Sequence, residues 1–418
     1  MAKEYRLLLS YTEKPESHTI EAYESLGGYS GLRRALEMEP DEIIEEVKKA
    51  GLKGRGGAAF PTGRKWSFIP KDHPGPKYVV DNADEGEPGT FKDRELLYRA
   101  PHLVLEGMTI AGRAIGAREG YMYLRYEYLW IFPRIKRAIR EAYAKGYLGK
   151  NILGSGFDFD IYVYLGAGAY IAGYAVSTLE SLEGKRPYPR LKPPRTSQVG
   201  LYGKPTAVNN VETHANVPII LSKGADWYSQ LGTPESRGTR LFSISGAVKR
   251  PGVYEFELGS LTLREFIYDV AGVPEDAEIL GVFPGGLSSQ ILTPDELDVP
   301  MTHEDLEKVG STLGSGAVIV LDRSTSALKV LRRAIEFFSY ESCGKCTPCR
   351  EGGNWMTRLL VNAEKRGYMT KDDVSLLREI ADMMRGRNFC PLGDSAEMVA
   401  RVFLSKYEDE LTRQPVAA

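Results

Sequence analysis

Residues 341–351 read ESCGKCTPCRE and carry three of the chain's four cysteines, Cys343, Cys346 and Cys349, each separated from the next by two residues. The fourth, Cys390, lies in RNFCPLGD, residues 387–394. Three thiolates on one tight turn, joined by a fourth from a distant segment, form a ferredoxin-like spacing for a [4Fe–4S] cluster. The spacing therefore predicts a protein that handles electrons one at a time.

Two other uses of the cysteines are weaker. Structural zinc also accepts four thiolates, but its sites usually pair them as two separate C-x-x-C hooks. Disulfides belong mostly to oxidising compartments, and the first residues, MAKEYRLLLS, lack the apolar core of a signal peptide. Zinc therefore remains the alternative to the cluster, and disulfides rank below it.

Composition narrows the class of protein. A chain of 418 residues is long enough for several domains. The formal charge of −2 indicates no nucleic-acid-binding face. No apolar run approaches the roughly 18 residues needed to span a bilayer. We therefore expect a cytoplasmic protein that reaches the inner face of the cell membrane only through partner subunits.

The pattern of elements divides the chain into four parts. Residues 1–30 form an N-terminal extension, and 31–240 alternate between helical and strand-like segments, as in an α/β layered domain. Residues 241–326 predict a small α+β domain. From 327 to 418 the pattern is helical, and a helical bundle would hold the cluster.

Particular segments carry this interpretation. Helices are expected over 41–50, 94–116 and 132–146, and from the glycine-rich segment GAGAYIAG, 166–173, to about residue 182. Strands are expected over 77–80, 159–165, 278–283 and 317–321.

The segment GLKGRGGAAFPTGRK, residues 51–65, is rich in glycine and basic residues. It formally meets a dinucleotide fingerprint, but it follows a helix, whereas a Rossmann fingerprint follows a strand. Gly54, Gly56 and Gly57 would still let a flat or phosphorylated ligand approach the backbone closely. The alternative is a turn with solvated basic side chains, and for this loop alone the two interpretations stand even.

A second candidate loop is DNADEGEPGTFKDRE, residues 81–95. So many carboxylates usually mark a solvated loop. This one follows an apolar strand, and ligands of α/β sheets sit beyond the carboxyl ends of strands. Asn82 and Asp84 are therefore candidates to hydrogen-bond the edge of a heteroaromatic ring.

Eight blocks in order resemble one family: KGRGGAAFPTGRKW, DNADEGEPGTFKDR, LGKNILGSGFDFD, GAGAYIAG, SLEGKR, PRLKPP, GKPTAVNNVET and ESCGKCTPCREG. They resemble the NADH-binding flavoprotein subunit of respiratory complex I, the F subunit of NADH-quinone oxidoreductase, and the similar subunits of NAD-linked hydrogenases and formate dehydrogenases. The resemblance runs from about residue 25 to 405. It implies a Rossmann-like FMN-binding domain, a ubiquitin-like β-grasp domain and a C-terminal four-helix bundle with the cluster.

The resemblance also implies roles for individual residues. Those matched to the cofactor sites are Gly54, Gly56, Gly57, Phe60, Lys65, Phe68, Asn82, Asp84, Glu85, Gly173, Lys192 and, in an NNVET turn, Asn209, Asn210 and Thr213. Glu87 and Tyr170 match catalytic positions, and these two residues together with Phe60 and Phe68 match positions that line the nicotinamide dinucleotide. The four cysteines match the ligands of the family's [4Fe–4S] cluster.

The chain departs from the family pattern near the dinucleotide. Tyr174 and Ala175 stand where the family has two adjacent glutamates, and Arg195 replaces an aromatic residue that stacks on adenine. A carboxylate there would accept ribose hydroxyls and repel a 2′-phosphate. Cofactor choice shifted toward NADPH, a blocked pocket supplied by another donor, and unchanged NADH oxidation all remain open.

The implied activity is that of an NADH:quinone oxidoreductase. Hydride would pass from NAD(H) or NADP(H) to FMN, and electrons would then reach the cluster singly. Four cysteines allow one such cluster, so electrons would leave to a thioredoxin-like [2Fe–2S] subunit and a larger iron–sulfur subunit. The alternative is a homologue with an altered or dead nicotinamide pocket that relays electrons or acts as a scaffold.

Overall fold

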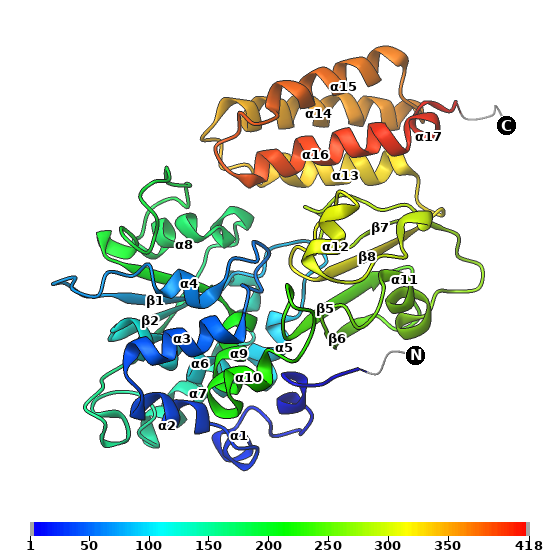
Figure 1. Ribbon diagram of the computed structural model, residues 1–418. Helices are drawn as coiled ribbons and strands as arrows, with labels where there is room; N and C mark the ends of the chain where they lie inside the picture. Colours follow the sequence, from blue (N-terminus) through cyan, green and yellow to red (C-terminus); the bar gives the residue numbers. More distant parts are fainter. Residues whose placement is uncertain (1–3, 415–418) are drawn as a thin grey trace.

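Four short parallel strands form the first sheet in the order β3-β2-β1-β4. They are β1 (Tyr78–Ala83), β2 (Glu119–Leu124), β3 (Asp160–Leu165) and β4 (Thr206–Asn210). The computed structural model describes residues 4–414, and Figure 1 shows this sheet in the N-terminal half of the chain. Because the strands are parallel, their carboxyl ends meet at one edge, where a ligand site is expected.

Helices cover both faces of this sheet. Val79 and Ala83 of β1 lie in the same core as residues of α6 (Pro101–Ile115) and α9 (Val211–Lys223). On the other face Val80 packs with Leu179 of α8 (Ala175–Leu182). Successive side chains of a strand point to opposite faces, so buried residues throughout β1 indicate a strand covered on both sides.

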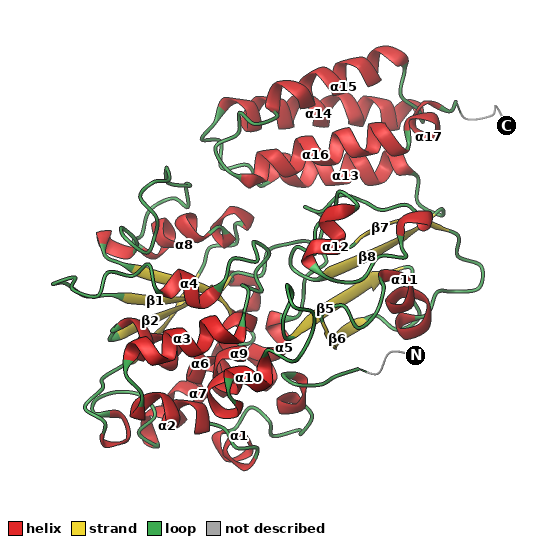
Figure 2. Ribbon diagram, viewed as in Figure 1, coloured by secondary structure: helices red, strands yellow, loops and turns green. Residues whose placement is uncertain are grey.

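The remaining helices of this half surround that core (Figure 2). They are α1 (Ile20–Ser25), α2 (Ser30–Glu37), α3 (Pro40–Ala50), α4 (Thr62–Trp66), α5 (Asp93–Arg99), α7 (Phe132–Ala144), α10 (Ala225–Tyr228), and the 3₁₀ helices η1 (Leu9–Thr12), η2 (Tyr126–Tyr128), η3 (Ile152–Gly154), η4 (Tyr170–Gly173) and η5 (Leu201–Gly203). Helix α3 begins at a capping box between Glu39 and Glu42 and ends at Gly51, whose φ of 73° is left-handed. The glycine-rich loop therefore starts where α3 stops.

The first residues of the described chain are anchored to the second sheet. The backbone N–H groups of Leu8 and Leu9 donate to the buried carboxylate of Glu255 over 2.8 and 2.9 Å. The N–H of Tyr5 donates to the backbone carbonyl of the same Glu255 over 2.9 Å. The described part of the N-terminal segment therefore ties the first half of the chain to the second half.

The second sheet is mixed, in the order β6-β5-β8-β7. Its strands are β5 (Thr239–Gly246), β6 (Gly252–Glu257), β7 (Ile279–Phe283) and β8 (Ala317–Asp322), with α11 (Leu263–Glu265), the π-helical turn η6 (Phe266–Ala271), η7 (Pro294–Glu296) and α12 (His303–Lys308) around them. The first and last strands, β5 and β8, pair in parallel at the centre. This is the β-grasp arrangement that the resemblance implied.

The last part of the described chain is helical, with α13 (Ala327–Tyr340), α14 (Thr347–Arg366), α15 (Lys371–Met384), α16 (Pro391–Lys406) and the short α17 (Glu408–Thr412). Buried residues of this bundle share a core with Phe283 of β7 and Ile171 of η4. The bundle therefore packs on both other parts, and Figure 1 shows it above the second sheet. Among residues 4–414, no helix has both the length and the hydropathy that a bilayer crossing requires.

Two expectations about local structure were incomplete or wrong. Strands β2 and β4 were not predicted. The NNVET segment is not a turn, because Asn209 and Asn210 end β4 and Thr213 lies in the first turn of α9. Asn210 caps α9, and its side-chain oxygen accepts the N–H of Glu212 over 3.0 Å. A strand end followed directly by a helix N-terminus is a usual place for an anionic group.

Candidate functional site: a cleft from the parallel sheet to the cysteines

Two adjoining chambers of about 310 and 470 Å³ form one cleft at the carboxyl edge of the parallel sheet. Both are lined by Gly56, Asn82, Gly173 and Asn210, so they are continuous. The smaller chamber also reaches Cys390. The cleft therefore links the sheet edge to a predicted cluster ligand.

Nearly all of the predicted organic-cofactor residues meet here. The larger chamber is lined by Gly54, Phe60, Lys65, Phe68, Lys192, Asn209 and Thr213, and the smaller one by Asp84, Glu85, Glu87 and Tyr170. Gly57 is the exception, because it lines neither chamber. Its φ of 125° instead lets the loop turn, which a residue with a Cβ would do only under strain.

The glycine loop presents backbone to the cleft. The N–H of Gly54 donates to the carbonyl of Phe60 over 2.9 Å and closes the loop. A Cβ at Gly56 would lie 3.0 Å from the Cβ of Asn210, which is tighter than an ordinary contact. The Arg55 side chain is buried and donates to the carbonyl of Arg237 over 2.8 Å. Arg55 therefore joins this loop to the chain beyond α9.

Asp84 is the clearest sign of a ligand site. Its Oδ2 atom is buried and has no hydrogen-bond partner among the described residues. Burial, offset in part by Arg125, raises the pKa of this carboxyl to about 7. Buried polar atoms are normally satisfied, so a ligand with a ring N–H would complete this site. The edge of a flavin ring has that chemistry, and the residues present fit FMN.

Glu85 lines the smaller chamber, and its carboxylate bonds to the protein itself. It accepts the backbone N–H of Asp93 over 2.7 Å and the hydroxyl of Tyr128 over 2.6 Å. Burial raises its pKa, and the nearby Asp93 adds to the effect. Although it lines the smaller chamber, its carboxylate is already engaged, so it holds the acidic loop in shape.

Asn82 and Lys65 are also fixed by the protein. Asn82 Nδ2 donates to the carbonyl of Gly173 over 2.7 Å, which ties the acidic loop to η4. Lys65 Nζ donates to the carbonyl of Val208 over 2.8 Å. Burial, together with Lys192, lowers the pKa of Lys65 to about 8. An anionic ligand would favour the charged form of this lysine.

Sequence reasoning missed a buried ion network in the smaller chamber. Lys92 Nζ lies 2.7 Å from Asp93 Oδ1 and 2.6 Å from Glu212 Oε2, and all three side chains are at most 3% exposed. Asn210 Nδ2 donates to the second oxygen of Asp93 over 2.6 Å. The one signal in the sequence was a lysine among the carboxylates of the acidic loop. Where such a lysine is buried, it is almost always paired with an opposite charge.

Glu87 and Tyr170 form a pair inside the same chamber. The Tyr170 hydroxyl donates to Glu87 Oε2 over 2.6 Å, and the N–H of Ser288 donates to Oε1 over 2.7 Å. Burial raises the pKa of Glu87 despite these donors. Ser288 lies in the β-grasp part, far from any local motif, so only the folded chain could reveal its contribution.

The outer end of the larger chamber is aromatic and basic. The rings of Phe60 and Phe68 lie 6.2 Å apart, and the Arg195 guanidinium carbon lies 5.4 Å from the centre of Phe68. Lys192 Nζ donates to the Tyr174 hydroxyl over 2.9 Å. The departures noted in the sequence therefore gather at one place and leave the chamber open.

The cysteines gather at the end of the bundle that faces the cleft. Cys346 precedes α14 directly and Cys390 precedes α16 directly. Burial raises the pKa of the Cys349 thiol to about 11, and the other three cysteines contribute to that shift. All four are free thiols.

The grouping of these thiols bears on zinc. Among the described residues, no three His, Cys, Asp or Glu side chains are grouped tightly enough to hold a single metal ion. Zinc–sulfur bonds of about 2.3 Å would draw four thiolates close together. The thiols of the described range are therefore not arranged as the ligands of a single zinc ion.

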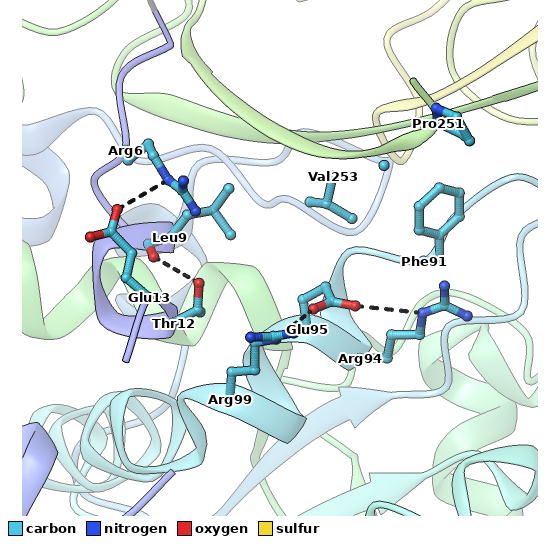
Figure 3. A pocket seen from close by; sticks show the side chains of 11 residues that line it. Arg6, Leu9, Thr12, Glu13, Phe91, Arg94, Glu95, Arg99, Pro251 and Val253 are labelled. Atoms are coloured by element: carbon cyan, nitrogen blue, oxygen red, sulfur yellow. Dashed lines mark hydrogen bonds and ion pairs between the residues drawn. The ribbon is translucent and has the colours of Figure 1, made fainter. Parts of the chain in front are cut away.

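A hollow of about 820 Å³, larger than either chamber, lies elsewhere (Figure 3). It is lined by residues of the N-terminal segment, α5 and β6, and holds none of the predicted site residues. Its charges are already paired, with Arg6 3.4 Å from Glu13 and Arg99 3.2 Å from Glu95. We therefore place the candidate site in the cleft and not here.

Comparison with known families agrees with this architecture. Residues 47–219 match the Nuo51 FMN-binding domain, 240–320 the SLBB domain, and 329–414 the NADH-ubiquinone oxidoreductase-F iron–sulfur binding region. Fold and site together define a flavin- and iron–sulfur-binding oxidoreductase subunit.

Individual relatives identify the family within this class. The chain is 48% identical to the NADH-quinone oxidoreductase F 2 subunit of Rhizobium meliloti over 97% of this chain and 96% of that one. It is 46% identical to the F subunit of Streptomyces coelicolor, over 97% and 91%, and 46% identical to that of Aquifex aeolicus, over 97% and 93%. The chain belongs to the family of NADH-quinone oxidoreductase F subunits.

A solved structure extends the similarity to hydrogenases. The H2-reduced NAD+-reducing [NiFe]-hydrogenase superposes with a TM-score of 0.85 at 36% identity, over 98% of this chain. The chain spans 66% of the length of that hydrogenase chain. The shared fold confirms the predicted combination of a parallel α/β domain, a β-grasp domain and a helical C-terminal part.

Proposed function

We propose that this protein is the electron-input subunit of a multi-subunit oxidoreductase, which takes hydride from a reduced nicotinamide dinucleotide and delivers electrons singly to partner subunits. One observation carries the proposal: a single cleft runs from the aromatic pair Phe60 and Phe68 to Cys390. Bound FMN would supply the change from two-electron to one-electron chemistry, and a [4Fe–4S] cluster would accept single electrons.

The residues of the cleft would divide the work of binding. Gly54 and Gly56 would let the flavin approach the backbone, and Asp84 would accept from its ring edge. The strand end at Asn209 and Asn210, with Lys65 and Thr213 beside it, would hold the phosphate. The cluster would be ligated by Cys343, Cys346, Cys349 and Cys390, beside the N-termini of α14 and α16.

Glu87 and Tyr170 would position the nicotinamide. Their mutual hydrogen bond and the Ser288 N–H fix both side chains, which limits the orientations open to a substrate ring. The rings of Tyr170 and Phe337 meet edge to face with their centroids 5.2 Å apart, and the Tyr170 backbone N–H donates to Glu341 over 3.0 Å. The same residue would therefore set the distance between the dinucleotide site and the cysteine loop.

The number of cysteines indicates which partners the chain would need. One cluster per chain leaves electrons no further internal carrier, so a thioredoxin-like [2Fe–2S] subunit and a larger iron–sulfur subunit would receive them. Contact with the membrane would come through these partners. A relay that has lost its dinucleotide site is the weaker candidate, because the larger chamber remains open between its aromatic side chains.

An anaerobic titration tests the proposal. The full chain, reconstituted with FMN, iron and sulfide, is titrated with NADH and NADPH while flavin absorbance is followed. Bleaching by either dinucleotide supports the function, and bleaching by neither defeats it. The variant Cys390→Ser should lose iron and acid-labile sulfide yet keep the flavin and its bleaching. An equal iron content in that variant would remove Cys390 from the ligand set.

A further inference from the structure

The larger chamber of the cleft has an unusual balance of charge. Its lining includes three cations, Lys65, Lys192 and Arg195, and no aspartate or glutamate. Three hydroxyl side chains, Tyr174, Thr196 and Ser197, are the other donors at its outer end. A chamber of this composition attracts anions and offers no carboxylate to repel them.

The two outer cations are available to a ligand. Lys65 lies deep in the chamber and is engaged by the carbonyl of Val208. Lys192 and Arg195 are exposed, and neither forms an ion pair with any residue of the described range 4–414. Lys192 donates only to the Tyr174 hydroxyl, and the Arg195 side chain rests against the Phe68 ring. A bound phosphate would give both side chains a negatively charged hydrogen-bond acceptor.

With the nicotinamide beside Glu87 and Tyr170 in the smaller chamber, as proposed, the outer end of the larger chamber would take the adenosine half of the dinucleotide. Phe60 and Phe68 provide flat surfaces for an adenine, and both rings lie about 6 Å from the Arg64 guanidinium, which adds a further positive charge. In dinucleotide sites a carboxylate that accepts the ribose 2′-hydroxyl selects NAD, whereas a nearby arginine accommodates the 2′-phosphate of NADP. Here the residues after Gly173 are Tyr174 and Ala175, and the cation is Arg195.

Resting on the proposed function, we propose that Arg195 and Lys192 form a subsite for the 2′-phosphate of the dinucleotide, so that the chain accepts NADPH as a hydride donor. Arg195 would contribute a planar fork of N–H donors suited to phosphate oxygens, and Lys192 a compact charge. The 2′-phosphate takes no part in the hydride transfer. NADPH would lose one hydride and leave as NADP+, as NADH would leave as NAD+.

The first test measures binding without any turnover. Adenosine 2′,5′-bisphosphate and 5′-AMP, which differ only in the 2′-phosphate, are titrated into the FMN- and cluster-loaded chain by calorimetry. We expect the bisphosphate to bind at least tenfold more tightly at low salt, with the advantage shrinking as ionic strength rises. Equal or weaker binding of the bisphosphate would overturn the subsite.

Variants assign the effect to the two residues. Arg195→Gln and Lys192→Gln should each cut the preference for the bisphosphate several-fold while leaving 5′-AMP affinity nearly unchanged. Arg186→Gln is the matched control, since Arg186 is an exposed arginine of the same segment that does not line the chamber. A preference that survives both substitutions, or falls equally in the control, would place the phosphate elsewhere and overturn the assignment.

The titration of flavin absorbance separates this inference from the proposed function. With the subsite, the concentration that half-saturates the rate of flavin bleaching is no higher for NADPH than for NADH. Arg195→Gln raises this concentration for NADPH alone. Bleaching by NADH but not by NADPH would overturn the subsite and leave the proposed function standing. Bleaching by neither would defeat the proposed function, and the bisphosphate titration would still decide the subsite.

Discussion

The Tyr170 hydroxyl donates to Glu87 Oε2 over 2.6 Å, and this bond joins η4 to the acidic loop inside the cleft. Both side chains are half-buried, and burial raises the pKa of Glu87 while Tyr170 and Ser288 lower it. The ionised form of Glu87 is therefore stabilised by two hydrogen-bond donors of the protein. That dependence makes the pair testable.

Tyr170→Phe removes one of these donors and should raise the pKa of Glu87 further. If the Glu87 carboxylate positions the nicotinamide, the acidic limb of the pH profile for flavin bleaching moves to higher pH in this variant. Single-turnover bleaching rates measured from pH 5 to 9 check the shift. Tyr164→Phe is the control, because Tyr164 donates to Ser181 outside the cleft. Superimposable profiles for Tyr170→Phe and the unmodified chain would count against a role for this pair.

The Lys92 network makes a prediction about stability. Lys92→Met would leave Asp93 and Glu212 buried without their counter-ion, which typically costs about 3–5 kcal/mol. Urea unfolding of the apo chain should show that loss in the transition of the N-terminal half. Lys49→Met removes an exposed lysine paired with Asp226 and should barely change the transition. A loss for Lys92→Met no greater than for that control would mean that the network relaxes or admits water.

Much of the fold could be predicted from local patterns. Helix α3 has apolar positions at helical spacing, acidic residues first and lysines last, and it was expected over 41–50. Strand β3, DIYVYL, was also expected. Strand β4 was not, because Thr206 and Asn209 interrupt its apolar character, and only its neighbours in the sheet explain why it is buried.

The site divides in the same way. Cysteine spacing and glycine content are local, so the cluster ligands and the glycine loop could be named from the sequence. Ser288 and Ser315 line the smaller chamber from the β-grasp part, and no motif surrounds either. Pairings between distant segments, such as Lys92 with Glu212, depend on tertiary packing. Local patterns therefore indicated the two loops, and the resemblance supplied the other residues of the cleft, but neither could say which of its charges the protein itself satisfies.

Glu106 gives a pH dependence with a defined sign. This buried carboxyl accepts the Tyr23 hydroxyl and the N–H groups of Tyr29 and Leu32, yet burial raises its pKa from 4.5 to about 7. The folded chain therefore keeps a proton that the unfolded chain releases above pH 4.5. The contribution of Glu106 to the free energy of unfolding is therefore fully present below pH 4.5. It falls as the pH rises toward 7, by an amount on the order of 3 kcal/mol.

Glu106→Gln tests that sign, because glutamine does not titrate. The unfolding free energy of the unmodified chain minus that of the variant should decrease between pH 5 and 7 and then level off. Urea titrations at several pH values give this difference directly. Glu45→Gln, at an exposed residue paired with Lys48, is the control and should give a flat difference. A difference that grows with pH would mean that Glu106 is ionised in the folded chain.

Asp84→Leu separates ligand binding from folding. The substitution removes an oxygen that has no partner among the described residues but is placed to accept from a ligand in the smaller chamber. Leaving a ligand donor unsatisfied costs about 1–3 kcal/mol, so FMN affinity should fall about 5- to 150-fold. The apo chain should be no less stable, since a buried carboxyl with a raised pKa gives way to an apolar side chain of similar size.

FMN fluorescence quenching measures the loss of FMN affinity, and thermal unfolding measures the stability of the apo chain. Asp72→Asn, at an exposed loop position, should change neither. Undiminished FMN affinity in Asp84→Leu would move the flavin edge away from this carboxylate, and a large fall in stability would show that Asp84 supports the loop instead.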